Sequence, residues 1–293
     1  MSTYTLSVRT EISGGDVADG VKCSWKEPSW SKAVVLVHGF NVSQTEAVDS
    51  YRDFLSNTPL EASETLLGPV FMCFWPGDEP LPVLSELSYP LQIPKAKKSA
   101  RKFAEFLRSR PTAAGWPLEI VLICHSLGCR LALEMVRCLS ETLVNDRIRV
   151  TRLILMAAAV PRGHVDENNS RLRPAVKLSS MFKKPKTLFS SADGVLHYAF
   201  PIGQIAAFDT GGEFWPRAVG RFGDPKRMWD LSDMGVFDYA HGHYWGHKES
   251  AQRVSEYLGI PIGRELDEAK TPEHRALSAT SIASRTLPSW TFG

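Results

Sequence analysis

The 293-residue sequence has few of the features that mark several classes of protein. It has five cysteines, an odd number, and no Cys-x-x-Cys pair, so it indicates neither a disulfide framework nor a zinc site. Its net charge of +2 gives no reason to expect a nucleic-acid partner. Its longest strongly apolar run, 153–160, is too short to span a bilayer. We therefore expect a protein that uses no metal, cofactor or nucleic acid.

The N-terminal residues MSTYTLSVRT contain no basic segment followed by an apolar core, so the sequence predicts no secretory signal and a cytoplasmic location. With 43% hydrophobic and 23% charged residues, the composition is typical of a globular protein. We expect a single domain over residues 1–263. Residues 264–293 have little apolar content and no clear period, which predicts an extended or disordered tail.

Short apolar runs alternate with segments of helical period, which predicts a mostly parallel sheet of about eight strands flanked by helices. Several runs are apolar throughout, as in strands that are buried on both faces. The predicted strands are 3–10, 21–25, 33–40, 69–76, 118–126, 152–160, 187–193 and 227–232. The predicted helices include 96–107, 128–140 and 249–258.

Two segments resemble insertions more than parts of this alternating pattern, and both are candidates for a lid or cap. Residues 78–94 are rich in proline and leucine, and residues 161–186 are polar and basic. The basic stretches 95–102 and 177–186 are candidates for weak contact with an anionic membrane surface. For the first stretch, the solvated face of a helix is the simpler interpretation. The sequence gives no indication of an oligomeric state.

The pentapeptide Cys-His-Ser-Leu-Gly at 124–128 departs at one position from the Gly-x-Ser-x-Gly signature of serine hydrolases. In that signature a tight turn between a strand and a helix raises the serine out of the sheet edge. The turn is crowded, so the positions two before and two after the serine must be small, and Cys124 and Gly128 satisfy this requirement. Ser126 is therefore a candidate nucleophile, although a serine at this place can also simply cap the helix.

A second element, His-Gly-Phe-Asn at 38–41, follows an earlier buried strand. A His-Gly pair there lets the chain turn close to the nucleophile, and the next backbone N–H can donate a hydrogen bond to an oxyanion. We predict that the amides of Phe40 and Leu127 form the oxyanion hole. A glycine at a strand exit is common by itself, so the prediction depends on both elements occurring together.

The segments VHGFN and CHSLGC, in this order, resemble the α/β-hydrolase superfamily. The intervening FMCFWPGD (71–78) is similar to one poorly characterised branch, which carries Phe-x-Trp-Pro between these elements and usually has Ala at the position of Cys124. The resemblance covers roughly residues 31–258. It implies an α/β-hydrolase fold and a triad in the chain order Ser, acid, His.

The resemblance implies an acid in the loop that follows TLFSS (187–191), where Asp193 stands in the sequence SSADGVL. A carboxylate there can bind the second ring nitrogen of the base and fix its tautomer. Asp-Gly is also a common turn signal, so Asp193 has a purely structural alternative. Asp209 and Asp230 remain the other candidates for the acid.

The base is expected in FDYAHGHYWGHKES (237–250), just before the last helix. The resemblance favours His241, which precedes Tyr244 and Trp245, and His243 is the alternative base. His247 is expected at the surface. His-x-His can also contribute to a metal site, but no cluster of further ligands with metal spacing accompanies it. We expect structural or site-lining roles for His38 and His125, and a solvated loop position for His164.

Together these elements predict a serine hydrolase that cleaves an ester-type acyl bond, in the manner of a carboxylesterase or lipase, through a Ser126–Asp193–His241 triad and an acyl-enzyme. Its partner would be a small-molecule or lipid-like acyl substrate. A thioesterase or amidase using the same triad remains open, as does a catalytically silent hydrolase fold that serves as a binding module.

Overall fold

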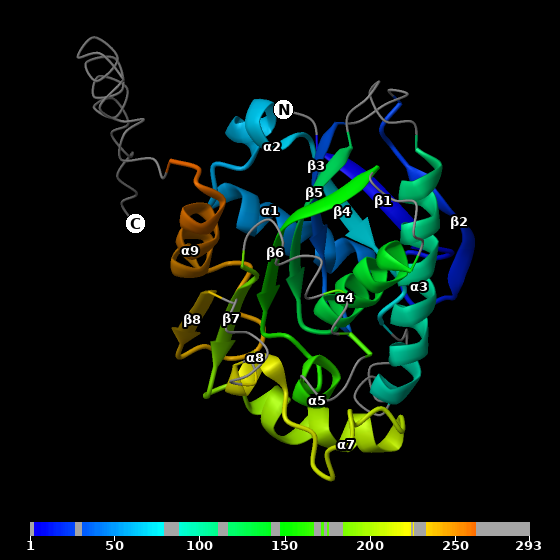
Figure 1. Ribbon diagram of the computed structural model, residues 1–293, viewed down its shortest axis with the longest axis vertical. Helices are drawn as coiled ribbons and strands as arrows, with labels where there is room; N and C mark the ends of the chain where they lie inside the picture. The colour runs from blue at the N-terminus through cyan, green and yellow to red at the C-terminus, as the bar shows by residue number, and fades with distance from the viewer. Residues whose placement is uncertain are drawn as a thin grey trace, which may run out of the picture.

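The computed structural model forms a single sheet with helices on both faces (Figure 1). The predicted strand 227–232, residues 79–87 and 177–183 of the candidate lid and basic segments, and the predicted tail 264–293 lie outside the described part of the chain. The described residues are 3–26, 31–78, 88–110, 117–141, 147–166, 171–172, 175, 184–223, 225 and 233–261.

The sheet has eight strands in the order β2-β1-β4-β3-β5-β6-β7-β8, and only the β1–β2 pair is antiparallel. The α/β-hydrolase fold class predicted from the sequence is thereby confirmed. The strands are β1 (Tyr4–Arg9), β2 (Val17–Cys23), β3 (Lys32–Val37), β4 (Val70–Phe74), β5 (Leu118–His125), β6 (Ile148–Met156), β7 (Lys186–Ser190) and β8 (Asp233–Phe237).

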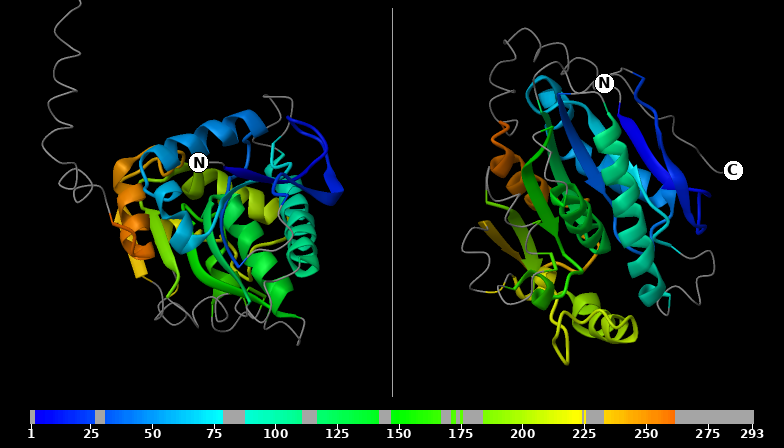
Figure 2. Two further views of the ribbon diagram at one scale, coloured as in Figure 1. Left: turned by 90° about the horizontal axis from the view of Figure 1, so that it is seen from above. Right: turned by 45° about the vertical axis from the view of Figure 1, so that its right-hand side comes forward.

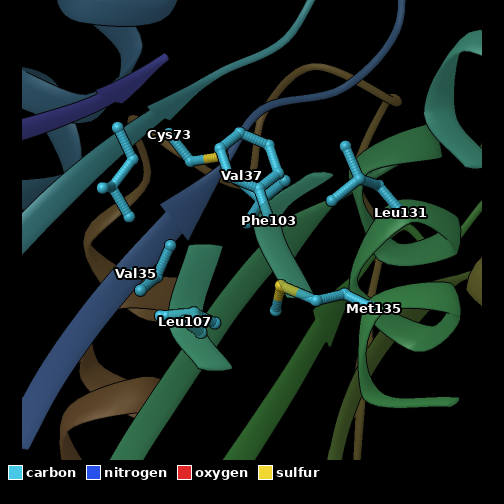
Figure 3. A pocket seen from close by; sticks show the side chains of 8 residues that line it. Val35, Val37, Cys73, Phe103, Leu107, Leu131 and Met135 are labelled. Atoms are coloured by element: carbon cyan, nitrogen blue, oxygen red, sulfur yellow. The ribbon is translucent and has the colours of Figure 1, made fainter. Parts of the chain in front are cut away.

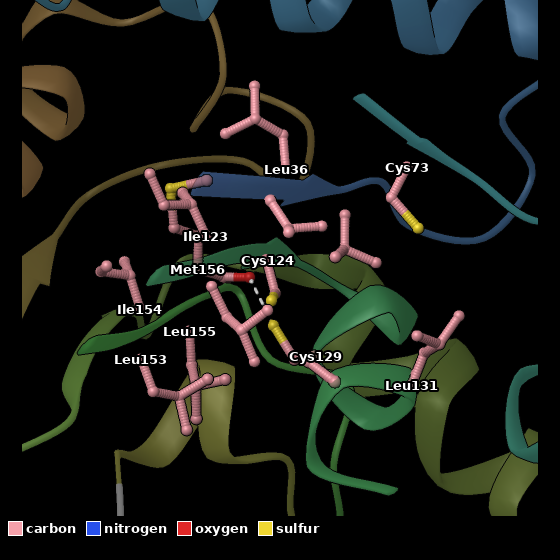
Figure 4. Packing of buried hydrophobic residues seen from close by; sticks show 14 of the residues in the cluster. Leu36, Cys73, Ile123, Cys124, Cys129, Leu131, Leu153, Ile154, Leu155 and Met156 are labelled. Atoms are coloured by element: carbon pink, nitrogen blue, oxygen red, sulfur yellow. Dashed lines mark hydrogen bonds between the residues drawn. The ribbon is translucent and has the colours of Figure 1, made fainter. Parts of the chain in front are cut away.

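The central strands are buried on both faces, as their continuous apolar runs predict. In the middle of the sheet Val37 pairs with Cys124, and Cys124 pairs in turn with Leu155. Figure 4 shows this region, where Cys124 points towards Cys129 of the helix that follows β5. All five cysteines are free thiols. Burial holds the pKa of both Cys124 and Cys129 well above the usual value, so these two thiols stay protonated and unreactive.

Helices α3 and α4 pack against each other on one face of the sheet, and α1 and α9 lie on the other (Figure 2). A small apolar cavity of about 10 Å³ lies between the sheet and the first pair, lined by Val37, Cys73, Phe103 and Leu131 among others (Figure 3). No helix in the described part of the chain is long and apolar enough to cross a membrane. The four helices are α1 (Gln44–Ser56), α3 (Tyr89–Ser109), α4 (Leu127–Ser140) and α9 (Lys248–Leu258).

Shorter elements gather beyond the carboxyl ends of the central strands, where Figure 1 shows α5, α7 and α8 together. The π-helical turn η3 continues directly into α7, so the two form one curved helical unit. These elements are α5 (Arg162–Val165), η3 (Val195–Ala199), α7 (Phe200–Ala206) and α8 (Val219–Phe222), while η1 (Glu61–Ser63) and α2 (Glu64–Leu67) precede β4 at the opposite end.

The structure differs from the expected insertions at their ends. Residues 89–94 belong to α3 and not to a loop, and Pro90 and Pro94 lie within its first turns. Residues 162–165 form α5. The basic segment 95–102 also lies in α3. There Lys95 donates a hydrogen bond to the carbonyl of Gly15, and Lys97 pairs with Asp209.

Candidate active site

Ser126 occupies a sharp turn between the end of β5 and the start of α4. Its backbone has φ 53° and ψ −126°, a left-handed conformation that is unfavourable for any residue with a side chain. Three main-chain hydrogen bonds hold it there: Ser126 N–H donates to Met156 O, and Ser126 O accepts from the N–H groups of Cys129 and Ala159. The turn therefore keeps a strained serine at the carboxyl edge of the sheet.

Two glycines make room for this turn. A Cβ atom on Gly39 would lie 2.7 Å from Ser126 Cβ, and one on Gly128 would lie 2.3 Å from the carbonyl oxygen of His38. Both distances are shorter than real Cβ contacts, so any other residue would push the two segments apart. The glycines of the HGFN and CHSLG elements thus let the end of β3 contact the serine turn directly.

Cys124, which replaces the first glycine of the signature, lies inside the last part of β5 and is completely buried. Its side chain fills space in the sheet core next to Cys129 (Figure 4). The two glycine positions of the signature are therefore under different steric constraints. At position 128 a side chain would collide with the backbone of His38, so only glycine fits, whereas at position 124 the core accommodates a small side chain.

Ser126 forms a hydrogen bond with His241, which lies in the turn between β8 and α9. The distance from His241 Nε2 to Ser126 Oγ is 2.7 Å, and the distance from His241 Nδ1 to Asp193 Oδ2 is also 2.7 Å. A carboxylate only accepts, so His241 carries its proton on Nδ1 and donates it to Asp193. Nε2 is then free to accept a proton from the serine hydroxyl.

Asp193, in the loop after β7, is completely buried. Its Oδ1 accepts a hydrogen bond of 2.9 Å from the Leu196 N–H, which leaves Oδ2 for His241. The loop is fixed in turn by Arg221, whose guanidinium donates to the carbonyl of Asp193. The carboxylate is therefore held in one orientation and shielded from water.

Two further histidines support the site in neutral form. His125 Nε2 lies 2.8 Å from the carbonyl of His241, which positions the turn that carries His241. His38 Nδ1 donates a hydrogen bond to the carbonyl of Gly39, and His38 Nε2 accepts one from the Trp75 N–H. Burial lowers the pKa of each imidazole to about 3, so both are uncharged near neutral pH.

The amides predicted to form an oxyanion hole come from two segments that meet at the serine turn. Leu127 is the first residue of α4, where backbone N–H groups have no intrahelical acceptor. Phe40 follows Gly39, whose backbone contacts Ser126. The role of both amides stays a prediction.

A cavity of about 270 Å³ opens onto Ser126 and His241. Apart from the site itself, the described residues that line it are almost all apolar, and they include no Lys, Arg, Asp or Glu. Its walls come from four segments: the residues after β3, the start of α3, the residues after β6, and the η3–α7 unit. The lining residues include, in that order, Phe40 and Asn41, Tyr89, Ala159, and Leu196 with Phe200.

The sequence matches the model of a family described as alpha/beta hydrolase of unknown function (DUF900) over residues 21–199. The chain belongs to this alpha/beta-hydrolase family. The matched region contains Ser126 and Asp193 but ends before His241.

Among solved structures, this alpha/beta hydrolase is similar to acyl-protein thioesterase 2 of Zea mays, with 15% identity, a TM-score of 0.43, and coverage of 80% of this chain and 95% of that one. It is also similar to an esterase of Pyrococcus furiosus, with 14% identity, a TM-score of 0.38, and coverage of 82% and 85%. A third is acetyl xylan esterase from Paenibacillus sp. R4, with 14% identity, a TM-score of 0.37, and coverage of 80% and 77%. No curated protein matches the sequence.

The alternative residues of this hydrolase lie elsewhere. His243 is exposed and its ring stacks on that of His247, with 4.9 Å between the centroids, so it faces away from the pair formed by Ser126 and Asp193. Asp230 lies outside the described residues. In the part of the chain that the structure describes, no three His, Cys, Asp or Glu side chains form a group that could hold a metal ion.

Asp209 belongs to a separate buried cluster, and the expectation of a solvated His164 is wrong. Asp209 Oδ1 lies 3.1 Å from His164 Nε2, and Oδ2 lies 2.9 Å from Arg130 Nη2. Burial by itself raises the pKa of Asp209, but the hydrogen bond with His164 and the charges of Arg130 and Lys97 hold it well below its usual range. Burial also lowers the pKa of His164. The cluster ties the segment after α7 to α4.

Sequence reasoning missed the groups that orient the acid and the base. Arg221 and the Leu196 N–H act on Asp193, and Ser190 Oγ accepts from the Tyr239 N–H, which joins the ends of β7 and β8. The Leu196 N–H is three residues from Asp193, so this contact is local, whereas the Arg221 and Ser190 contacts join segments that are far apart in the sequence. Ser190 lies inside the predicted strand 187–193, so nothing in the local sequence marks it.

Proposed function

We propose that this alpha/beta hydrolase is a serine hydrolase that cleaves a carboxylic ester through an acyl-enzyme. One observation carries the proposal: the His241 ring joins the hydroxyl of Ser126 to the buried carboxylate of Asp193, with 2.7 Å on each side. A serine hydroxyl is a weak nucleophile until a neighbouring base removes its proton. This chain of contacts supplies that base in the correct tautomer.

In the first step Ser126 Oγ attacks the ester carbonyl carbon while its proton moves to His241 Nε2. The imidazolium that forms is stabilised by Asp193, which stays ionised throughout. The carbonyl oxygen becomes an oxyanion that receives hydrogen bonds from the amides of Phe40 and Leu127. His241 then gives its proton to the departing alcohol oxygen, and the acyl group remains on Ser126.

In the second step a water molecule replaces the alcohol. His241 removes a proton from the water, the hydroxyl attacks the acyl carbon, and a second oxyanion forms in the same place. Its collapse returns the proton to Ser126 Oγ and releases the carboxylic acid. The strained backbone of Ser126 keeps Oγ at one position through both steps, so the amides need not rearrange.

The proposal favours an ester over an amide because alcohols leave more easily than amines, while the protonated His241 can serve as the acid for either leaving group. A thioester uses the same steps with a thiolate as the leaving group. Parallel kcat/KM values for an ester, a thioester and an amide of one acyl group separate the three.

A fluorophosphonate probe tests the proposal, because it reacts with a serine only when a neighbouring base activates it. We expect stoichiometric labelling of the wild type on the peptide that contains Ser126, and none of Ser126→Ala. Ser56→Ala, which changes an exposed serine at the end of α1, serves as the matched control and should be labelled at the wild-type rate. Equal labelling of Ser126→Ala would refute the proposal.

A further inference from the structure

The cavity beside Ser126 combines three properties that restrict what it can hold. It is in contact with both Ser126 and His241, its volume is about 270 Å³, and the described residues that line it include no Lys, Arg, Asp or Glu side chain. A charged group placed there would lose its hydration without gaining a partner, which costs several kcal/mol. An aliphatic group gains free energy in proportion to the area it buries.

Aromatic contacts and a hydrogen bond join the walls of the cavity. Tyr89 packs edge-to-face against Phe40, with ring centroids 5.3 Å apart, and against Phe200, at 6.4 Å. The hydroxyl of Tyr89 accepts a hydrogen bond of 2.9 Å from Gln204, which ties α3 to α7. Phe200 and Leu196 are both buried. These contacts join three segments of the wall to one another: the residues after β3, the start of α3 and the start of α7.

We propose that this cavity binds an uncharged aliphatic chain of the ester, and that Ala199 and Phe200 set the length it accepts. The proposal rests on the proposed function and names its substrate class. A water-sized group takes roughly 30 Å³, so the cavity of about 270 Å³ holds about nine such groups; with two of them taken by the ester oxygens, about seven are carbons, the carbonyl carbon included. Phe200 is buried in the wall, and Ala199 lies at the solvent-exposed edge.

Straight-chain p-nitrophenyl esters from acetate to palmitate test the length. We expect kcat/KM to rise about fourfold for each methylene that enters the cavity, to reach its maximum at about six to eight carbons, and to stop rising beyond it. A second series, acetate esters of alcohols from ethanol to decanol, asks whether the chain belongs to the acyl or the alcohol side. A length optimum in one series assigns the side, and flat profiles in both overturn the proposal.

The absence of charge is tested with two acyl groups of equal length. p-Nitrophenyl hemisuccinate carries a carboxylate at the end of a four-carbon chain, and p-nitrophenyl butyrate carries a methyl group. We expect kcat/KM for the hemisuccinate to be lower on the order of a hundredfold, because the cavity offers no partner for the carboxylate. Comparable values for the two esters would contradict an uncharged site.

Substitutions in the η3–α7 unit test the residues. Ala199→Leu places a larger side chain at the edge of the cavity and shortens the space for the chain, so the ratio of kcat/KM for the octanoate ester to kcat/KM for the butyrate ester should fall about tenfold. Phe200→Leu widens the wall, and the length optimum should move to longer chains. Ala206→Leu makes the same change as Ala199→Leu on the same helical unit, at an exposed position outside the cavity, and should leave the whole profile unchanged. An unaltered ratio in Ala199→Leu, with Phe200→Leu also unaltered, would overturn the assignment of these residues.

Failure of this inference is distinguishable from failure of the proposed function. Fluorophosphonate labelling at Ser126 together with a flat chain-length profile overturns the inference and leaves the serine hydrolase intact. Absence of labelling, together with no hydrolysis of any ester in the two series, overturns both.

Discussion

Asp193 Oδ2 lies 2.7 Å from His241 Nδ1, and the carboxylate is completely buried while the imidazole is half-buried. The Leu196 N–H occupies the second carboxylate oxygen, so only one oxygen of Asp193 faces the ring. This relationship fixes both the tautomer and the direction of His241.

Replacing Asp193 by Asn should lower kcat by about 10⁴-fold, because an amide can present its NH₂ group to the ring and favour the wrong tautomer. Substrate affinity should change little, since Asp193 does not line the cavity. Steady-state kinetics with the best ester of the length series provide the measurement. Asp238→Asn, at an exposed position before the same turn, is the matched control. A loss of less than tenfold would contradict the role of Asp193.

His241→Ala and His243→Ala should differ sharply even though the two residues share one turn. The first substitution removes the base and should lower kcat on the order of a millionfold. The second removes an exposed ring that stacks on His247, so kcat should stay within about twofold of the wild type, as expected for a surface change. Turnover and probe labelling of both variants provide the measurement. A large loss in His243→Ala would reassign the base.

The stability of the protein should fall as the pH decreases below 6.5, because His38 and His125 have a pKa of about 3 in the folded state. The unfolded chain binds protons at these positions from about pH 6.5 downward, whereas the folded protein does not, so each histidine favours folding above pH 6.5 and loses that effect towards pH 3. Between pH 7.5 and 5 the free energy of unfolding should decrease by about 2 kcal/mol for each histidine.

Urea unfolding of the wild type and of His125→Gln at both pH values isolates one of these contributions, because every other titrating group is common to the two proteins. The variant should lose less stability than the wild type on acidification. An identical pH dependence in the two proteins would show that His125 titrates normally in the folded state.

Cys124→Gly should keep Ser126 reactive while lowering the stability of the protein. Restoring the glycine of the signature leaves the turn open, but it empties a buried position and adds backbone freedom within β5, at a cost of about 1–3 kcal/mol. Cys124→Ala should cost less, because it retains Cβ. Labelling rates and urea unfolding of both variants test this. Loss of labelling in a folded Cys124→Gly protein would mean that the turn depends on the cysteine itself.

The sequence predicted the fold well because the central strands β3, β5 and β6 each contain a continuous apolar run, at 33–37, 120–124 and 153–156. It could not place residues 89–94 in a helix. Pro90 is tolerated in the first turn, but Pro94 lies deeper in α3, where packing of Tyr89 and Ile93 against the core outweighs a poor local propensity.

The same limit applies to the site. The order of the motifs in the sequence suggested Ser126 and Asp193. His241 and His243 lie on one short turn and differ in the direction in which their side chains point, which the local sequence does not encode. His164 was misread because its partner, Asp209, lies on a different segment and contributes nothing to the local pattern. In each case the deciding contact joins residues that are distant in the chain.

In the proposed mechanism Ser126 carries the acyl group during turnover. Rapid acid quenching of the wild type with a p-nitrophenyl ester, followed by peptide mass spectrometry, is the most direct test. We expect a burst of p-nitrophenol and an acyl adduct on Ser126, both absent from Ser126→Ala. Turnover with the adduct on another residue, or undiminished turnover by Ser126→Ala, would contradict it.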